Sequence, residues 1–258
     1  MGTPLFSIIT ITRDNLAGLR TTVNSVKCQS FRDFEHIVVD GASTDGSADW
    51  LAGNVDATWV SEPDRGRYDG MNKGARMATG TYLWFMNAGD VFGDNLVLER
   101  AASAIKDSGD PEWLYGLARL MAPDGTLQGV LGFVPFSMFH FAILHRPLAH
   151  QATVFKRDFF WSLGGYDEQI GHAADQLLML VAANESPPLA LADFFCDFDA
   201  TGVTAGRSWW ITYRDGYEIF RRCDVSVTRW RALDTFLASC YAILRLLGLS
   251  LRAVLRSA

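Results

Sequence analysis

The feature that most constrains the fold is an alternation, over residues 1–90, of short β-branched runs with segments of helical periodicity. We expect strands over 6–11, 34–39, 57–61 and 81–86, each followed by polar or glycine-rich residues. Helical segments lie between them: one follows Asn15, a short one passes through 47–51, and one over 69–79 stops at Gly80. This β-α-β repetition predicts an α/β fold with a mostly parallel open sheet, whose ligands bind at the carboxyl ends of the strands.

The second half of the sequence is less regular. Residues 114–128 predict a hairpin that turns at Pro123-Asp-Gly125, 151–156 a strand, and 158–163 and 174–183 helices. The apolar and aromatic stretch over 129–148 could be core or a hydrophobic acceptor surface, and core is the favoured interpretation.

The composition fits one large domain with a basic C-terminal segment. The 258 residues are 49% hydrophobic and 20% charged, which excludes disordered, collagen-like and coiled-coil classes. The net charge of −6 argues against nucleic acid as a partner. Residues 205–258 nevertheless hold nine Arg against four acids, a net +5, which leaves −11 for the remainder. We therefore expect one domain over 1–204 and a basic tail over 205–258.

The cysteines and the start of the sequence favour a cytoplasmic protein. The four cysteines form no Cys-x-x-Cys pair, so we expect reduced thiols and neither a zinc nor a redox motif. We expect no signal peptide, because the first strand begins near Leu5 with no basic segment before it. No uncharged apolar run reaches the roughly 20 residues that a membrane span needs.

Carboxylates follow two of the predicted strands. Asp40 opens the run Asp40-Gly-Ala-Ser-Thr-Asp-Gly46, where it could accept a hydrogen bond from a nucleobase while the glycines admit a close ligand. Asp90 ends the run Asn87-Ala-Gly-Asp90, where an oxygen donor suits Mg²⁺ or Mn²⁺ beside phosphate. Taken singly, each is better explained by a tight turn.

Three further places in the sequence are candidates for chemistry. In the loop and helix start over 62–74, Arg65, Arg67 or Lys73 could meet a phosphate, or the stretch could be a solvated capping segment. Asp175 could serve as a general base if a neighbour fixes its ionisation. His150 could be a metal ligand, a phosphate contact or a core histidine with satisfied hydrogen bonds, and the last is the default.

Together, the order and spacing of these segments closely resemble the family 2 glycosyltransferases, which have the GT-A fold. The resemblance covers about residues 5–180, and it rests on Ser7-Ile-Ile-Thr-Ile-Thr12, Asp40-Gly-Ala-Ser-Thr-Asp-Gly46, Ser61-Glu-Pro-Asp64, Tyr68-Asp-Gly-Met-Asn-Lys-Gly74, Ala78-Thr-Gly80, Asn87-Ala-Gly-Asp90, His150-Gln151 and Ala174-Asp175. Within the family, the chain is most similar to small bacterial enzymes that build cell-surface polysaccharides or glycolipids. The resemblance implies a Rossmann-like nucleotide-binding half.

The resemblance also implies roles for the nucleotide-sugar-binding residues. Thr12, Asp40 and Ser43 would hold the nucleoside, with Asp40 on the base, while Asp64 would lie near the base or ribose, Lys73 near the diphosphate and Asn87 on a ribose hydroxyl. UDP is the first expectation for the nucleotide, because Asp40 fits a uracil or thymine imide. dTDP- and GDP-sugars stay open.

The metal and the base are implied in the same way. Asp90 would be the ligand for Mg²⁺ or Mn²⁺, with His150 as a second ligand, although Asn87 and Gly89 replace the usual acids of the family's Asp-x-Asp. Asp175 aligns with the base of the inverting members and would deprotonate a hydroxyl of a saccharide or lipid-linked acceptor. The alternatives are a sugar-phosphate nucleotidyltransferase and a non-catalytic sugar-nucleotide-binding module.

The basic tail has three interpretations. Thr228 to Arg256 predicts one helix, or two that meet near Gly248. One side would carry Trp230, Leu233, Leu237, Tyr241, Leu244, Leu251 and Leu255, and one stripe would carry Arg231, Arg245, Arg252 and Arg256. The helix could dock on the inner face of the cell membrane, pack on the domain with an exposed Arg face, or form a homodimer contact. We favour the membrane, because an enzyme with a lipid-borne acceptor would need it.

Overall fold

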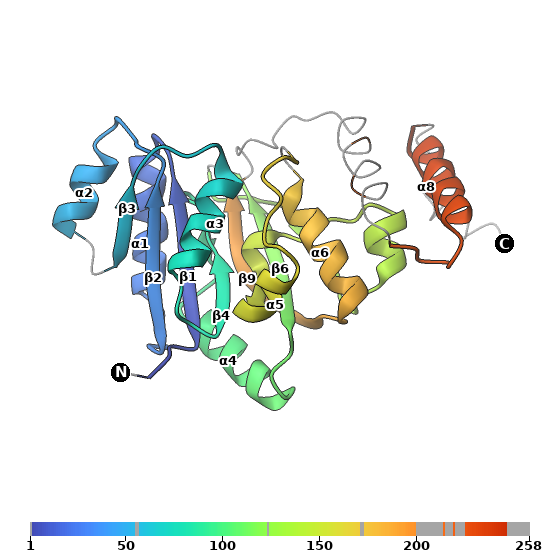
Figure 1. Cartoon of the computed structure of the whole chain (residues 1–258), viewed down its shortest axis with the longest axis horizontal. Coiled ribbons are helices and arrows are strands. Elements are labelled where there is room, and N and C mark those ends of the chain that lie inside the picture. The colour runs from blue at the N-terminus through green and yellow to red at the C-terminus, as the bar shows by residue number, and fades with distance from the viewer. Residues whose placement is uncertain are drawn as a thin grey trace.

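The computed structural model describes residues 2–54, 57–122, 124–170, 173–199, 214, 219 and 225–246 (Figure 1). Within them, nine strands form one sheet in the order β3-β2-β1-β4-β8-β6-β9-β5, with β7 paired to β6. The strands are β1 (Phe6–Thr12), β2 (Phe34–Asp40), β3 (Thr58–Ser61), β4 (Tyr82–Phe85), β5 (Val91–Phe92), β6 (Trp113–Met121), β7 (Leu127–Leu131), β8 (Thr153–Lys156) and β9 (Leu189–Asp199). The helices are α1 (Leu16–Lys27), α2 (Ser47–Asn54), α3 (Arg67–Met77), α4 (Val97–Asp107), α5 (Arg157–Ser162), α6 (Ala174–Glu185) and α8 (Arg231–Leu246), with the short turns η1 (Phe139–Ile143) and η2 (His150–Ala152).

The N-terminal half is the predicted parallel sheet. β1 pairs in parallel with both β2 and β4, and β2 pairs in parallel with β3. The register places Thr12 opposite Asp40 and Asp40 opposite Ser61, so the carboxyl ends of three strands lie at one edge. The polar loops that follow these strands therefore meet, which is the arrangement that binds ligands in open α/β sheets.

Side chains of the central strands are buried on both faces, which explains why most of their residues are apolar. Phe6 and Ile8 of β1 pack in one cluster with Trp84, whereas Ile9 packs in the other with Phe85. Helix α1 covers the first face and helix α3 the second. Because successive side chains of a strand point to opposite faces, a sheet between two helical layers needs apolar residues at every position.

Local sequence signals set the start of α1. The side chain of Asn15 accepts a hydrogen bond from the N–H of Gly18 at 3.0 Å, as an N-cap residue does. Leu19, Val23 and Val26 are buried at spacings of four and three, which places them on the face toward the sheet. The predicted helix is confirmed.

The C-terminal half of the sheet is mixed rather than parallel. β8 runs antiparallel to β4 and to β6, β5 runs antiparallel to β9, and β6 runs parallel to β9. The predicted hairpin forms from β6 and β7, and its Gly125 has a φ of 81°, while Pro123 lies outside the described residues. The strand at β8 and the helices α5 and α6 are also confirmed, whereas α4, β5 and β9 were not predicted.

The apolar stretch before β8 divides between core and surface. Phe133 and Phe141 are buried and Phe136 packs against them, but Phe139 is 39% exposed. Helix α8 lies at one end of the molecule (Figure 1) and packs on η1. Of the predicted tail, Gly248, Leu251, Leu255, Arg252 and Arg256 lie outside the described residues. Among the described residues, no helix is both long and apolar enough to cross a bilayer.

Candidate active site

Asp40 anchors the loop that follows β2. Its side chain is fully buried, and the Ser61 hydroxyl donates to Oδ2 at 2.6 Å. The Ser43 N–H donates to Oδ2 at 3.1 Å, and the Ser43 hydroxyl donates to Oδ1. Because a carboxylate can accept about four hydrogen bonds, Oδ1 keeps room for one further donor. The predicted pair of Asp40 and Ser43 is thus brought together.

Asp64 lies over the same strand end. Its Oδ1 accepts the N–H of Gly66 at 3.0 Å, and Arg13 Nη1 lies 3.8 Å from the same oxygen. A Cβ atom on Gly41 would lie 2.4 Å from Asp64 Oδ2, so only glycine allows this close approach. The structure therefore brings Asp64 to the end of β2, beside Asp40, as predicted for two nucleoside contacts.

The loop that follows β4 is fixed by helix α1. The hydroxyl of Thr22 lies 2.7 Å from the carbonyl oxygen of Asp90 and accepts the N–H of Gly89 at 2.9 Å. Asn15 Nδ2 donates to the carbonyl of Ala88 at 3.1 Å. Gly89 has a φ of 109°, a conformation that favours glycine. These contacts fix the position of the loop that carries Asn87 and Asp90.

A row of four polar side chains connects this loop to helix α6. Asn87 Nδ2 lies 3.0 Å from His150 Nε2, and His150 Nδ1 lies 3.2 Å from Asp175 Oδ2. On the other side, the hydroxyl of Tyr68 donates to Asp175 Oδ1 at 3.1 Å. A neutral imidazole with its proton on Nδ1 satisfies both contacts of His150. Residues of α3, η2 and α6 thus meet at the Asp175 carboxylate, and the loop after β4 is joined to them through His150.

The surroundings of Asp175 keep it ionised. Burial by itself raises the pKa of this carboxyl, but the hydrogen bond and electrostatic interaction with His150, and donation from Gln176 N–H and the Tyr68 hydroxyl, lower the pKa below its usual value. Oδ1 accepts two of these hydrogen bonds, from Gln176 N–H at 2.9 Å and from Tyr68, while Oδ2 accepts only from His150. Oδ2 therefore keeps the free acceptor position on this group.

The two predicted metal ligands have different partners. Gln151 Nε2 donates to Asp90 Oδ2 at 2.9 Å, whereas both ring nitrogens of His150 face Asn87 and Asp175. This arrangement does not support His150 as a metal ligand, because each ring nitrogen already has a hydrogen-bond partner and neither is available to a metal. The part of the chain that the structure describes holds no cluster of three or more His, Cys, Asp or Glu side chains suited to a metal.

The remaining donors still fit a divalent cation that arrives with a diphosphate. Asp90 is a buried carboxylate, and the Oδ1 atom of Asn87 is buried with no hydrogen-bond partner among the described residues. Mg²⁺ is commonly held by one or two protein oxygens while phosphate and water supply the rest. Thr12 Oγ1 is a second buried acceptor with no partner in the same part of the chain. Such atoms call for a ligand or a water.

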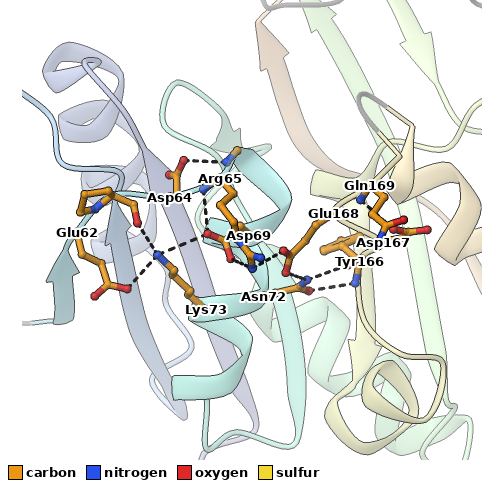
Figure 2. Close-up of polar contacts among 12 residues, drawn as sticks. Glu62, Asp64, Arg65, Asp69, Asn72, Lys73, Tyr166, Asp167, Glu168 and Gln169 are labelled. Atoms are coloured by element: carbon orange, nitrogen blue, oxygen red, sulfur yellow. Dashed lines mark hydrogen bonds and ion pairs between the residues drawn. The ribbon is translucent and has the colours of Figure 1, made fainter.

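Lys73 belongs to a charged group along α3 rather than to this row (Figure 2). We name the α3 network as Glu62, Arg65, Asp69, Asn72, Lys73 and Glu168. Lys73 Nζ lies 2.8 Å from the carbonyl oxygen of Pro63, 2.9 Å from Glu62 Oε1 and 3.6 Å from Asp69 Oδ2. An ammonium has three donors, and here one faces the Pro63 carbonyl while the other two face Glu62 and Asp69 of the network. The predicted contact of Lys73 with a diphosphate would require one of them to break.

The α3 network ties helix α3 to the loop before α6. Arg65 Nη2 lies 2.6 Å from Glu168 Oε2 and 2.9 Å from Asp69 Oδ1 (Figure 2). Asn72 donates to the carbonyl of Tyr166 at 2.8 Å and accepts the Tyr166 N–H at 3.0 Å. Because Tyr68 lies on α3 and Asp175 begins α6, this link holds the two partners of the Tyr68–Asp175 hydrogen bond in place.

Tyr68 and Gln151 belong to motifs that carry the family resemblance, but the sequence predicts no role for either residue. Tyr68 is 107 residues from Asp175 and Gln151 is 61 residues from Asp90. No local signal in the sequence connects positions so far apart. An aromatic hydroxyl in a polar helix start was the one available hint for Tyr68.

Comparison with known proteins decides the family. The sequence model described as Glycosyl transferase family 2 matches residues 7–130. An uncharacterized glycosyltransferase of Mycobacterium tuberculosis is 40% identical over 209 residues, which are 79% of this chain and 78% of the relative. The chain belongs to glycosyltransferase family 2. A second relative of this family 2 enzyme, a PGL/p-HBAD biosynthesis glycosyltransferase of Mycobacterium bovis, is 31% identical over 182 residues, 68% of each chain.

Solved structures show that the family 2 chain has the GT-A fold. S. aureus TarS 1–349 in complex with UDP-GlcNAc matches with a TM-score of 0.65 at 18% identity, over 92% of this chain and 71% of that one. The mannosyltransferase PcManGT from Pyrobaculum calidifontis, in complex with GDP-Man and Mn²⁺, matches with a TM-score of 0.63 at 19% identity, over 100% and 80%. Identities this low support a shared fold and leave the ligands of this glycosyltransferase to its own residues.

Proposed function

We propose that this glycosyltransferase moves a sugar from a nucleoside diphosphate to an acceptor hydroxyl with inversion, and that Asp175 is its general base. The observation that carries the proposal is the row from Asn87 to Tyr68, which connects an ionised carboxylate to the loop that follows β4. A base must be ionised and within reach of the proton that it removes.

The free acceptor position on Asp175 defines the proton transfer. The acceptor hydroxyl donates its proton to Oδ2 as its oxygen attacks the anomeric carbon, and the bond from that carbon to the diphosphate breaks on the opposite face. His150 keeps its hydrogen bond to the same oxygen and Tyr68 holds the other, so the carboxylate does not rotate. We assign His150 to this orienting role in place of the metal role.

The donor is proposed from the nucleoside end of the site. Asp40 Oδ1 keeps one acceptor position for a base N–H, and the unpartnered Thr12 and Asn87 oxygens suit sugar hydroxyls. TarS was solved with UDP and UDP-GlcNAc and PcManGT with GDP-Man, so a nucleotide-sugar is the supported class. UDP is the first candidate, and dTDP and GDP are the others.

The proposal includes Mg²⁺ or Mn²⁺ held by Asp90. The side-chain Oδ1 of Asn87, in the same loop, is a second oxygen available to the cation. A bound divalent cation would neutralise negative charge on the departing diphosphate. PcManGT was solved with Mn²⁺. The proposed acceptor is a saccharide or lipid-linked hydroxyl, since one relative is named for PGL/p-HBAD biosynthesis, and a peripheral location at the inner face of the membrane follows from a lipid-borne acceptor.

Asp175→Asn tests the base. Transfer should fall by about 10²–10⁴-fold because the amide cannot take a proton, while nucleotide binding stays within a few-fold of wild type. The measurement is release of nucleoside diphosphate from a panel of UDP-, dTDP- and GDP-sugars with Mn²⁺, together with thermal shift by the free diphosphates. Asp167→Asn, the same change on an exposed acid of the loop before α6, is the control.

Three results would contradict parts of this proposal. Full activity of Asp175→Asn would remove its role as base. Loss of nucleotide binding in that variant would make Asp175 a binding residue. Pyrophosphate release from a nucleoside triphosphate and a sugar phosphate would indicate a nucleotidyltransferase instead.

A further inference from the structure

Helix α8 packs on the molecule through a side that includes two alanines and the partly buried Leu237, yet it leaves several of its large apolar residues exposed to solvent. Asp234, Ala238 and Ala242, spaced by four, are buried. Leu233, Phe236 and Ile243, on the opposite side at helical spacing, are 40%, 62% and 54% exposed, and Trp230, just before the helix, is 74% exposed. A helix that packs on its own domain normally does the reverse, because burial of large apolar side chains stabilises the contact.

These four side chains, the α8 apolar face (Trp230, Leu233, Phe236 and Ile243), are concentrated in a short segment. Ten large hydrophobic side chains are exposed among the described residues, and these four lie within fourteen consecutive positions. A fifth, Phe139, belongs to η1, on which α8 packs. Single exposed apolar residues need no explanation, but a cluster of this kind marks an interaction surface.

The charges around the α8 apolar face select one occupant. Over 225–246 the sequence has three Arg and a single acid, Asp234. Asp234 is buried and accepts hydrogen bonds from the Ser226 hydroxyl at 2.7 Å and from the N–H groups of Val227 and Thr228 at 2.9 and 3.0 Å. Arg229 and Arg231, on either side of Trp230, are exposed. The charges that this segment presents outward are therefore positive.

We propose that the α8 apolar face lies in the headgroup region of an anionic lipid bilayer. Trp, Phe, Leu and Ile would enter the interface while the arginines beside Trp230 meet lipid phosphates. The predicted stripe of Arg does not coincide with the α8 apolar face: Arg231 is exposed at the start of the helix but lies around the helix axis on the side of Ala238 and Ala242. Membrane binding thus has two contributions, insertion of the apolar side chains and attraction of the Arg pair at the helix start to lipid phosphates. Neither depends on which donor the enzyme uses.

Vesicle binding by the full chain tests the proposal. The wild-type protein should sediment with vesicles of phosphatidylcholine and phosphatidylglycerol, and markedly less with phosphatidylcholine alone. Trp230→Ser/Phe236→Ser should weaken binding to the anionic vesicles by about tenfold or more, since two large apolar side chains no longer enter the interface. Arg229→Gln should weaken binding mainly at low salt.

The matched control is Leu127→Ser/Val130→Ser on β7, where the two side chains are 58% and 47% exposed. It should bind vesicles as the wild type does. All variants should keep the wild-type thermal unfolding midpoint, and Phe236→Ser alone replaces the double variant if it does not. Equal binding of the double variant and the wild type would overturn the proposal. So would a lipid-free dimer that the double variant abolishes, because a second copy would then cover this face.

Discussion

At the scale of single residues, the site depends on which hydrogen bonds reach Asp175. Tyr68, Gln176 and His150 all lower its pKa against the effect of burial. Tyr68 is itself buried and packs on Tyr166, with ring centroids 5.3 Å apart. Burial also raises the pKa of the Tyr68 hydroxyl, so it stays a donor throughout the working pH range. The ionisation of Asp175 is thus set by the neighbouring backbone N–H together with side chains from two distant parts of the chain, Tyr68 and His150.

Tyr68→Phe should raise the pKa of Asp175, because one hydrogen bond to the ionised form is lost. A base must be deprotonated, so the acid limb of the kcat profile should move up by about one pH unit, with the donor KM little changed. The measurement is kcat and KM from pH 8 down to the lowest pH at which both proteins stay folded, so that the wild-type acid limb is included. Tyr166→Phe is the control, since the Tyr166 hydroxyl has no partner among the described residues. An acid limb unmoved by Tyr68→Phe would rule out this role for Tyr68.

Asp90→Asn tests the proposed metal ligand at the same scale. The amide keeps a side chain of similar shape beside Gln151 but removes the negative charge. Binding of nucleoside diphosphate in the presence of Mn²⁺ should weaken by about tenfold or more, and binding without the metal should change little. Titration calorimetry with and without Mn²⁺ measures both. An unaltered Mn²⁺ titration would mean that the metal is held elsewhere or is not used.

At the scale of elements, α3 is the helix that joins the nucleotide end of the site to the base. It lies close to the sheet because Gly74 has no side chain. A Cβ atom at this position would lie 2.4 Å from Ile9 Cγ2 and 3.4 Å from Val39 Cγ2, both on buried strands. The sequence predicted a helix here but not how near it approaches β1.

Gly74→Ala should therefore destabilise the protein by about 1–3 kcal/mol, because the added methyl group forces α3 away from β1. Urea unfolding measures the free energy. Gly53→Ala in α2 is the matched control: no atom lies within 4 Å of the added Cβ, so helix propensity makes the change neutral or stabilising by up to about 1 kcal/mol. Equal stability of both variants would show that α3 can shift at no cost.

The elements differ in how well the sequence predicts them. β1, β2 and β4 are largely buried and mostly apolar, with clear ends, and α1 has its Asn15 cap, so local signals suffice. β5 has two residues and β9 pairs with β6, about 75 positions earlier in the chain, and with β5, about 100 positions earlier. A strand of this kind forms because the rest of the sheet supplies its partners, which periodicity within one segment does not reveal.

At the scale of the whole molecule, one buried histidine links folding to pH. His36 of β2 is buried, and its Nε2 lies 3.0 Å from Thr10 Oγ1 of β1. Burial, with a smaller effect from the charge of Lys27, lowers its pKa to about 4. The folded protein therefore keeps this ring neutral at pH values where an unfolded chain protonates it.

Stability should fall as the pH drops from about 6.5 to 4, because only the unfolded state gains this proton in that range. Each pH unit costs about 1.4 kcal/mol, or about 2 kcal/mol between pH 7 and 5. In His36→Gln this part of the pH dependence should disappear, whatever the variant's stability at pH 7. Urea unfolding of both proteins at pH 7 and 5 measures the difference. Parallel losses in the two proteins would show that His36 is not responsible.

The sequence by itself determined the alternation of strands and helices, the polar residues at the strand ends and the resemblance to family 2. These follow from propensity and periodicity, which act over a few neighbouring residues. Tertiary structure alone decided that His150 faces Asp175, that Lys73 is held within the α3 network and that α8 leaves Leu233, Phe236 and Ile243 exposed. Those outcomes depend on packing between segments far apart in the chain, where the partner of each side chain is chosen by the fold as a whole.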